Sequence, residues 1–262
     1  MTQPSELSPV AEPPLLSLVI PTRNEAITAP ELIAQLASVL APLSSEVIIV
    51  DDSDDDTLSI IGRAAAENNL NVRVIHRGLG RRKGGLSTAV IEGLRAATGR
   101  YFLVMDADLQ HPTDMIVPLV HRAEQHTADI VIASRYVRGG SDAGLAGPLR
   151  KFTSAAARWL VTLLFFDKLR AIHDPLSGFF LARRKILDTA SLRPIGFKIL
   201  LDILIRCHYS QVDEEPLRFD RRGGGSSKAN LSQGKDFLVH TIALVWDVRL
   251  AGLFRSVNRS RR

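Results

Sequence analysis

The feature that most constrains the fold is a regular alternation of short apolar runs with amphipathic segments over the first half of the chain. Apolar runs at residues 15–20 and 47–50 flank residues 29–40, whose apolar side chains recur at helical spacing. The alternation continues with predicted helices at residues 57–68 and 87–97 and a third that ends near residue 125. Predicted strands lie at residues 72–75, 101–105 and 129–134. This pattern predicts an α/β fold with a doubly wound, mostly parallel sheet flanked by helices.

The second half of the chain is less regular. It predicts a glycine-rich loop at residues 139–147, a basic loop at 218–228, helices at 149–166 and 199–208, and a strand at 179–182. We therefore expect three parts. They are a disordered segment at residues 1–14, one α/β domain at residues 15–230, and a C-terminal amphipathic helix with a basic tail at residues 231–262.

Charge and cysteine content narrow the class of partner and the compartment. The 262 residues carry a net charge of +5, and five arginines (249, 255, 259, 261 and 262) lie close to the C-terminus. The rest of the chain is nearly neutral, which predicts no nucleic-acid partner but a local contact with an anionic surface. The single Cys207 permits no intrachain disulfide, so we expect a reducing, cytoplasmic setting.

Two apolar stretches raise the question of a membrane. Residues 1–14 lack the features of a signal peptide. Residues 155–166 are too short to span a bilayer, and residues 237–254 are interrupted by His240, Asp247 and Arg249. We interpret both stretches as core helices or as amphipathic helices lying on the cytoplasmic face of a membrane or on a membrane-anchored partner.

Two acidic clusters follow predicted strands, and ligands of such sheets bind beyond the carboxyl ends of the strands. Asp106 and Asp108, with Gln110 two residues further, offer oxygen ligands to Mg²⁺ or Mn²⁺, and the alternative is a solvated turn. Asp52 is the candidate ligand of a nucleobase or ribose in the other cluster. We expect residues 54–56 to cap the next helix, and Asp51 fits either role.

A series of ordered motifs then indicates a family. Together they resemble glycosyltransferase family two, and within it the polyprenyl-phosphate sugar synthases of the dolichol-phosphate mannose synthase type. The resemblance covers residues 16–228, and the motifs are VIPTRNE at 19–25, VDDS at 50–53, KGGLS at 83–87, MDADLQHP at 105–112, SRY at 134–136, DPLSGFF at 174–180, GFK at 196–198 and R-x-x-G-x-SK at 222–228.

The resemblance implies a GT-A-like fold and roles for individual residues. The residues that would line a nucleotide-sugar pocket are Pro21, Arg23, Glu25, Val50, Asp52, Asp106, Ala107 and Asp108. Asp106, Asp108 and Gln110 would hold the metal. Arg135, Arg222 and Lys228 would contact phosphates, and Arg150 could join them or form a surface ion pair. Asp174 would orient the acceptor or an arginine, or cap the turn before Pro175.

Three positions depart from the family pattern. Arg23 stands where many members carry an aromatic residue that stacks on the base, although arginine can also stack. Ser87 and Asp202 replace a glycine and a glutamate that are common at their positions. Lys198 and Asp202 could form an ion pair within one helix turn. We expect His76, His111 and His173 to be structural, because their spacing fits no metal site.

The implied reaction is metal-dependent transfer of a hexose, with inversion, from a nucleotide sugar to a polyprenyl or dolichyl phosphate. Mannose from GDP-mannose is the first candidate, and UDP-glucose or a UDP-N-acetylhexosamine, with undecaprenyl phosphate or another acceptor, is the alternative. Asp106, Asp108, Arg135 and Asp174 are the expected catalytic residues. An inactive nucleotide-sugar-binding regulatory subunit is the alternative from another class.

Overall fold

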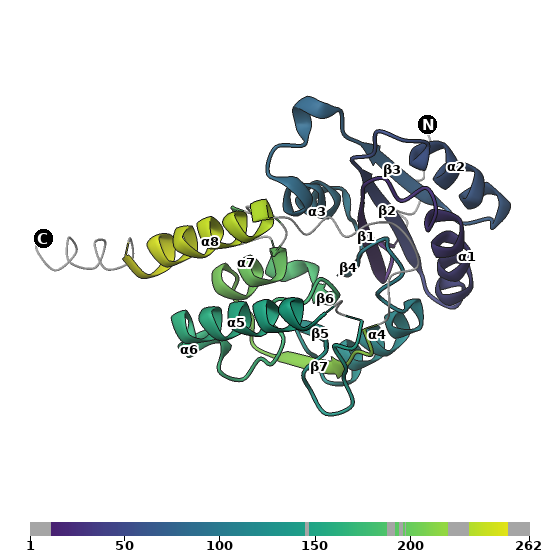
Figure 1. The fold of residues 1–262 in the computed structure, drawn as a ribbon. Coiled ribbons are helices and arrows are strands. Elements are labelled where there is room, and N and C mark those ends of the chain that lie inside the picture. The colour runs from purple at the N-terminus through teal and green to yellow at the C-terminus, as the bar shows by residue number, and fades with distance from the viewer. Residues whose placement is uncertain are drawn as a thin grey trace, which may run out of the picture.

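The computed structural model describes residues 12–144, 147–187, 192–193, 196, 198–219 and 231–250. The strands form one seven-stranded sheet in the order β3-β2-β1-β4-β6-β5-β7 (Figure 1). Their bounds are β1 (Leu16–Thr22), β2 (Ser45–Asp51), β3 (Val72–His76), β4 (Tyr101–Val104), β5 (Ile130–Ser134), β6 (Phe180–Arg183) and β7 (Val212–Pro216). In this sheet β6 runs antiparallel to β4 and β5, and the other pairs are parallel. The predicted α/β class with a mostly parallel sheet is confirmed.

Helices cover both faces of the sheet. They are α1 (Ala29–Leu40), α2 (Thr57–Glu67), α3 (Gly85–Ala96), α4 (Ile116–Gln125), α5 (Pro148–Leu164), α6 (Phe166–Leu169), α7 (Ile199–Arg206) and α8 (Leu231–Val245). One core joins α1, α2 and α4 to the sheet, and a second joins α3 and α5–α8 to its other face. Neighbouring strand residues alternate between these cores, since Leu18 belongs to the first and Val19 to the second. In Figure 1, α8 extends away from the sheet beside α7.

Two elements differ from the sequence-based expectation. The predicted helix at residues 149–166 is broken near Phe165 into α5 and the short α6. The strand β7 was not expected, because its sequence VDEEP has neither an apolar run nor a clean alternation. The edge position of β7, which pairs with β5 alone, suits a charged strand that ends in proline.

The helix α3 and the sheet approach each other closely. A Cβ atom on Gly93 of α3 would come within 2.4 Å of the Val19 side chain and 3.1 Å of the Val50 side chain. Glycine at this position therefore lets α3 pack directly on β1 and β2. No helix in the described ranges combines the length and the apolar character that crossing a bilayer requires.

A buried ion pair joins the ends of two strands to a helix. Arg77 directly follows β3, is 1% exposed, and donates from Nε and Nη2 to the two carboxylate oxygens of Asp52 at 2.7 and 2.6 Å. Its Nη1 donates to Thr88 Oγ1 in the first turns of α3 at 3.0 Å. The two parallel bonds to one carboxylate fix the orientation of both groups. Arg77 therefore holds the ends of β2 and β3 and the start of α3 together.

Replacing Arg77 with methionine should lower the free energy of unfolding by about 3–5 kcal/mol, because the Asp52 charge is left buried without a partner. The matched variant is Arg81→Met. Arg81 pairs with Glu92 while 62% exposed, so its loss should cost less than about 1 kcal/mol. Urea denaturation followed by circular dichroism measures both. Equal losses in the two variants would show that the Arg77–Asp52 pair is no more important than a surface pair.

Candidate functional site

The predicted metal ligands lie just beyond the end of β4. The Asp106 side chain is 39% exposed, whereas Asp108 is only 4% exposed as a residue. The Asp108 Oδ1 atom accepts the backbone N–H of Gln110 at 3.1 Å, which holds the turn between the two residues. Two carboxylates and an amide are the oxygen donors that Mg²⁺ and Mn²⁺ prefer, so the residues fit such an ion.

The number of protein ligands near Asp106 and Asp108 bears on how a metal ion would be held. Within the described part of the chain, no three His, Cys, Asp or Glu residues cluster closely enough to hold an ion. Magnesium commonly uses one or two carboxylates together with water and substrate phosphates. The pair Asp106 and Asp108 is compatible with this mode of binding.

A buried histidine supports the backbone of Asp106. His111 Nδ1 accepts the Asp106 backbone N–H at 3.0 Å, and the ring packs against Phe179 and Phe219 with centroids 5.0 and 5.6 Å apart. Burial lowers the pKa of His111 to about 4, against the opposing effect of Asp108, so the ring is neutral at pH 7. Because Nδ1 accepts a hydrogen bond, the single proton belongs on Nε2. The structural role expected for His111 agrees with this geometry.

The loop before β6 packs directly against Asp106. A Cβ atom on Gly178 would lie 3.3 Å from Asp106 Oδ2 and 3.4 Å from His111 Cε1. A Cβ atom at position 178 would require the Asp106 carboxylate to shift by a few tenths of an ångström. The DPLSGFF motif and the MDADLQHP motif, far apart in the sequence, are therefore in contact through their glycine and aspartate.

Arg135 and Asp174 form a buried ion pair at the start of this loop. Arg135 donates from Nε to Asp174 Oδ2 at 2.7 Å, from Nη2 to Oδ1 at 2.8 Å, and from its backbone N–H to Oδ2 at 3.1 Å. The Asp174 side chain is fully buried and the Arg135 side chain is 10% exposed. Burial by itself would lower the pKa of Arg135, but the hydrogen bonds and charge of Asp174 outweigh it and raise the pKa. Of the expected roles for Asp174, orienting an arginine is the one that this contact supports.

Lys198 brings a second cation to the same place. Its Nζ donates to the Leu176 carbonyl oxygen at 2.8 Å. Burial, and then the charge of Arg135, lower the pKa of Lys198 to about 8, against the opposing charges of Asp174 and Asp106. The expected alternative, an ion pair with Asp202, is not the contact that forms. Asp202 accepts hydrogen bonds from Arg206 at 2.9 Å and from His240 at 3.1 Å instead.

The acidic cluster after β2 is largely committed to internal contacts. Asp52, the expected nucleotide ligand, is 7% exposed and bound by Arg77. Asp51 is fully buried and binds Ser53 and His76, contacts that favour a structural role. Of the residues expected to cap α2, Asp55 accepts the backbone N–H of Thr57 at 3.1 Å, whereas Asp56, at the N-cap position, makes no side-chain cap hydrogen bond and Asp54 pairs with Arg82.

The remaining predicted pocket residues occupy varied settings. Pro21, Val50 and Ala107 are buried, and the Val50 side chain belongs to a small core with Ile48 and Ala89. Arg23 is exposed, whereas Glu25 and Arg150 are half-buried. Their roles as ligands stay predictions. Arg222 and Lys228 lie outside the described residues.

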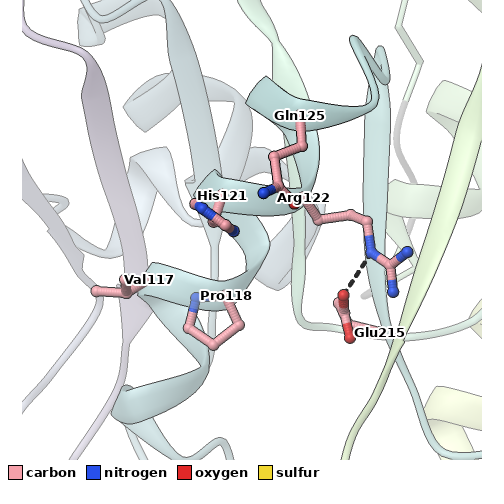
Figure 2. Close-up of a pocket in the computed structure, with 6 residues that line it drawn as sticks. All are labelled: Val117, Pro118, His121, Arg122, Gln125 and Glu215. Atoms are coloured by element: carbon pink, nitrogen blue, oxygen red, sulfur yellow. Dashed lines mark hydrogen bonds and ion pairs between the residues drawn. The ribbon is translucent and has the colours of Figure 1, made fainter.

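A hollow of about 590 Å³ lies elsewhere, beside α4 and β7 (Figure 2). Its lining residues are Val117, Pro118, His121, Arg122, Gln125 and Glu215. Arg122 and Glu215 are paired across it. None of the predicted site residues lines this hollow, so it is distinct from the strand ends described above.

Known proteins are similar to this chain over most of its length. The model of glycosyl transferase family 2 matches residues 17–190. The dolichol-phosphate mannosyltransferase of Pyrococcus furiosus is 39% identical, over 88% of this chain and 64% of its own. The enzymes of that name from Mycosarcoma maydis and Saccharomyces cerevisiae are 35% and 32% identical, over 82% and 81% of this chain and 74% and 80% of theirs. The chain thus spans less than two thirds of the archaeal relative.

Solved structures show the same fold. Glucosyl-3-phosphoglycerate synthase from Mycobacterium tuberculosis, crystallised with Mn²⁺, UDP-glucose and glycerol 3-phosphate, has a TM-score of 0.66 at 22% identity. Its structure with Mg²⁺ and UDP has a TM-score of 0.65 at 20% identity, and in both comparisons the match covers 89% of this chain and 79% of the other. The GT-A-like fold implied by the motifs is confirmed. On the family match and the sequence identities together, the chain belongs to glycosyl transferase family 2.

Proposed function

We propose that this protein is a metal-dependent, inverting glycosyltransferase that moves a hexose, mannose from GDP-mannose in the first instance, onto a polyprenyl or dolichyl phosphate. The observation that carries the proposal is its 39% identity to an archaeal dolichol-phosphate mannosyltransferase over 88% of this chain. The contacts that bring Asp106, Arg135, Asp174 and Lys198 to one end of the sheet support it.

The main requirement of this reaction is to offset the negative charge of the reacting phosphates. The acceptor phosphate oxygen is already anionic at neutral pH, so it can attack without a strong general base. Asp106, Asp108 and Gln110 would hold a divalent cation, which when bound offsets the negative charge that develops on the departing nucleoside diphosphate. Arg135, whose direction Asp174 fixes, and Lys198 supply positive charge where donor and acceptor phosphates must approach each other.

The side chains also account for transfer in preference to hydrolysis. A glycoside hydrolase places two carboxylates on opposite sides of the scissile bond, as acid and as base or nucleophile. Asp106 and Asp108 follow the same strand end, and Asp174 is bound to Arg135 through both of its oxygens. Attack by the acceptor from the face opposite the leaving group would then invert the anomeric carbon.

The proposed reaction predicts that label from GDP-[³H]mannose enters an organic-extractable product when the purified protein is incubated with polyprenyl phosphate vesicles. EDTA should abolish the transfer, and added Mn²⁺ or Mg²⁺ should restore it. Parallel incubations with UDP-[³H]glucose and UDP-N-acetyl[³H]glucosamine identify the donor. If none of the three donors labels the lipid, lipid-linked transfer is the wrong function for this chain.

Asp108→Asn should reduce the turnover by at least about 100-fold, because it removes the charge that a divalent cation needs while keeping the oxygen that accepts the Gln110 N–H. The matched control is Asp114→Asn, which makes the same change at an exposed residue of a nearby turn. We expect the control to keep wild-type turnover, and both variants to keep the wild-type melting temperature within a few degrees. A wild-type rate for Asp108→Asn would refute the metal assignment.

We also propose that the protein binds the membrane surface that holds its acceptor. On α5 and just beyond it, Phe152, Trp159, Leu163 and Phe166 are 58–70% exposed, and on α8 and just beyond it Leu238, Ile242 and Trp246 are 51–67% exposed. The ends of the two helices are in contact, since Arg249 donates to the Leu164 carbonyl oxygen and pairs with Asp167. Apolar side chains repeated at helical spacing beside basic residues are typical of helices that lie in the membrane interface.

The surface proposal predicts that the protein sediments with vesicles of phosphatidylglycerol and phosphatidylcholine. Replacing both Leu163 and Ile242 with glutamine should lower the partition coefficient by at least about 10-fold. Each substitution removes the favourable free energy of moving an apolar side chain from water into the membrane interface. Leu79→Gln is the control, since Leu79 is 79% exposed but belongs to a turn between β3 and α3. Equal partitioning of all three proteins would contradict a role for this face.

A further inference from the structure

The loop that carries Asp174 is fastened to the edge strand β7 by one carboxylate. Glu214 accepts the backbone N–H of His173 on Oε2 at 2.8 Å and the backbone N–H of Asp174 on Oε1 at 3.0 Å. The Nδ1 atom of His173 lies 2.7 Å from the same Oε2. The Glu214 side chain is only 9% exposed. Both of its oxygens are therefore used to hold the backbone of two consecutive loop residues.

The residue held by Glu214 is the one that orients Arg135. The Asp174 carboxylate accepts three hydrogen bonds from Arg135, two from the guanidinium and one from the backbone. Two contacts thus connect Glu214 to Arg135. The Glu214 carboxylate binds the Asp174 backbone, and the Asp174 carboxylate binds the Arg135 guanidinium. A shift of the Asp174 backbone would move the acceptor oxygens on which the direction of the guanidinium depends.

Strand pairing fixes Glu214 and Arg135 relative to each other. β7 lies parallel to β5, with Glu214 opposite Ile132 and Pro216 opposite Ser134, the residue just before Arg135. The pairing continues past the strand, because the Leu217 N–H donates to the Ser134 carbonyl oxygen at 2.8 Å. Glu214 and Arg135 are therefore held at a set spacing by neighbouring strands.

The neighbours of Glu214 on β7 point to the other face of the sheet. Asp213 pairs with His126 and Glu215 pairs with Arg122, both at the α4 side. This alternation follows from the period of two in a β-strand. The strand thus carries one glutamate that faces the Asp174 loop and, one residue later, another that faces away from it.

We infer that Glu214 is a positioning residue for the phosphate-binding arginine, acting through the backbone of Asp174. The inference rests on the proposed function for the reaction that Arg135 serves. A glutamine at position 214 keeps the shape of the side chain but has one acceptor oxygen in place of two. Its NH₂ group would face a backbone N–H, so one of the two amides loses its partner.

Steady-state kinetics of the purified protein test the effect on transfer. Glu214→Gln should lower kcat by at least about 10-fold, with a smaller change in KM for the donor. Glu215→Gln makes the same chemical change on the same strand and should stay within about 2-fold of wild type. In an Arg135→Gln background, Glu214→Gln should have no further effect, because the residue through which it acts is already gone. Additive losses in that double variant would overturn the inference.

The orientation of Arg135 can be measured without any substrate. In ¹H–¹⁵N spectra, the Arg135 Nε–H signal is identified by its absence in Arg135→Lys. We expect this signal to shift and to exchange faster with water in Glu214→Gln and in the shorter Glu214→Asp, and to stay unchanged in Glu215→Gln. A wild-type signal in both Glu214 variants, or an equal change in Glu215→Gln, would refute the positioning role. An altered signal in a protein that transfers no sugar would instead refute the proposed function alone.

Discussion

The buried ion pair between Arg135 and Asp174 is the interaction on which the candidate site depends. It joins the end of β5 to the loop before β6, and that loop in turn packs Gly178 against Asp106 at the end of β4. Burying a charged pair is favourable only when its geometry is good and its other hydrogen bonds are made. Both conditions are met here, because Asp174 receives three bonds from Arg135 and its own backbone is held by Glu214.

The first half of the fold could be predicted from the sequence because its elements are strongly periodic. The predicted helix at residues 29–40 has the bounds of α1, and the strands β1 to β5 lie within a few residues of their predicted positions. β7 could not be predicted, since its three acidic residues pair with groups on α4, just beyond α4 and in the Asp174 loop that only the folded chain brings near. Partners of this kind leave no local periodicity.

The candidate site, like the fold, could be predicted from the sequence only in part. The motifs identified Asp106, Asp108, Arg135 and Asp174, and the structure brings the loops that carry them together. Arg77 was missed, because a lone arginine after a strand carries no local signal that it will be buried against Asp52. Glu214 was missed for a related reason, since its strand was not recognised and its acceptor role involves backbone groups that no side-chain motif records.

The reversed direction of β6 has a consequence for how such a site can vary. An antiparallel strand begins at the end of the sheet where its neighbours finish. The residues that lead into β6 therefore lie at the same end of the sheet, here called the rim, as the residues that follow β4 and β5. The rim beyond β1, β2 and β3 is built by a separate stretch of chain, residues 21–85, with its own buried arginine. Changes in the connections around β6 can therefore reshape one half of the rim while the other half keeps its geometry.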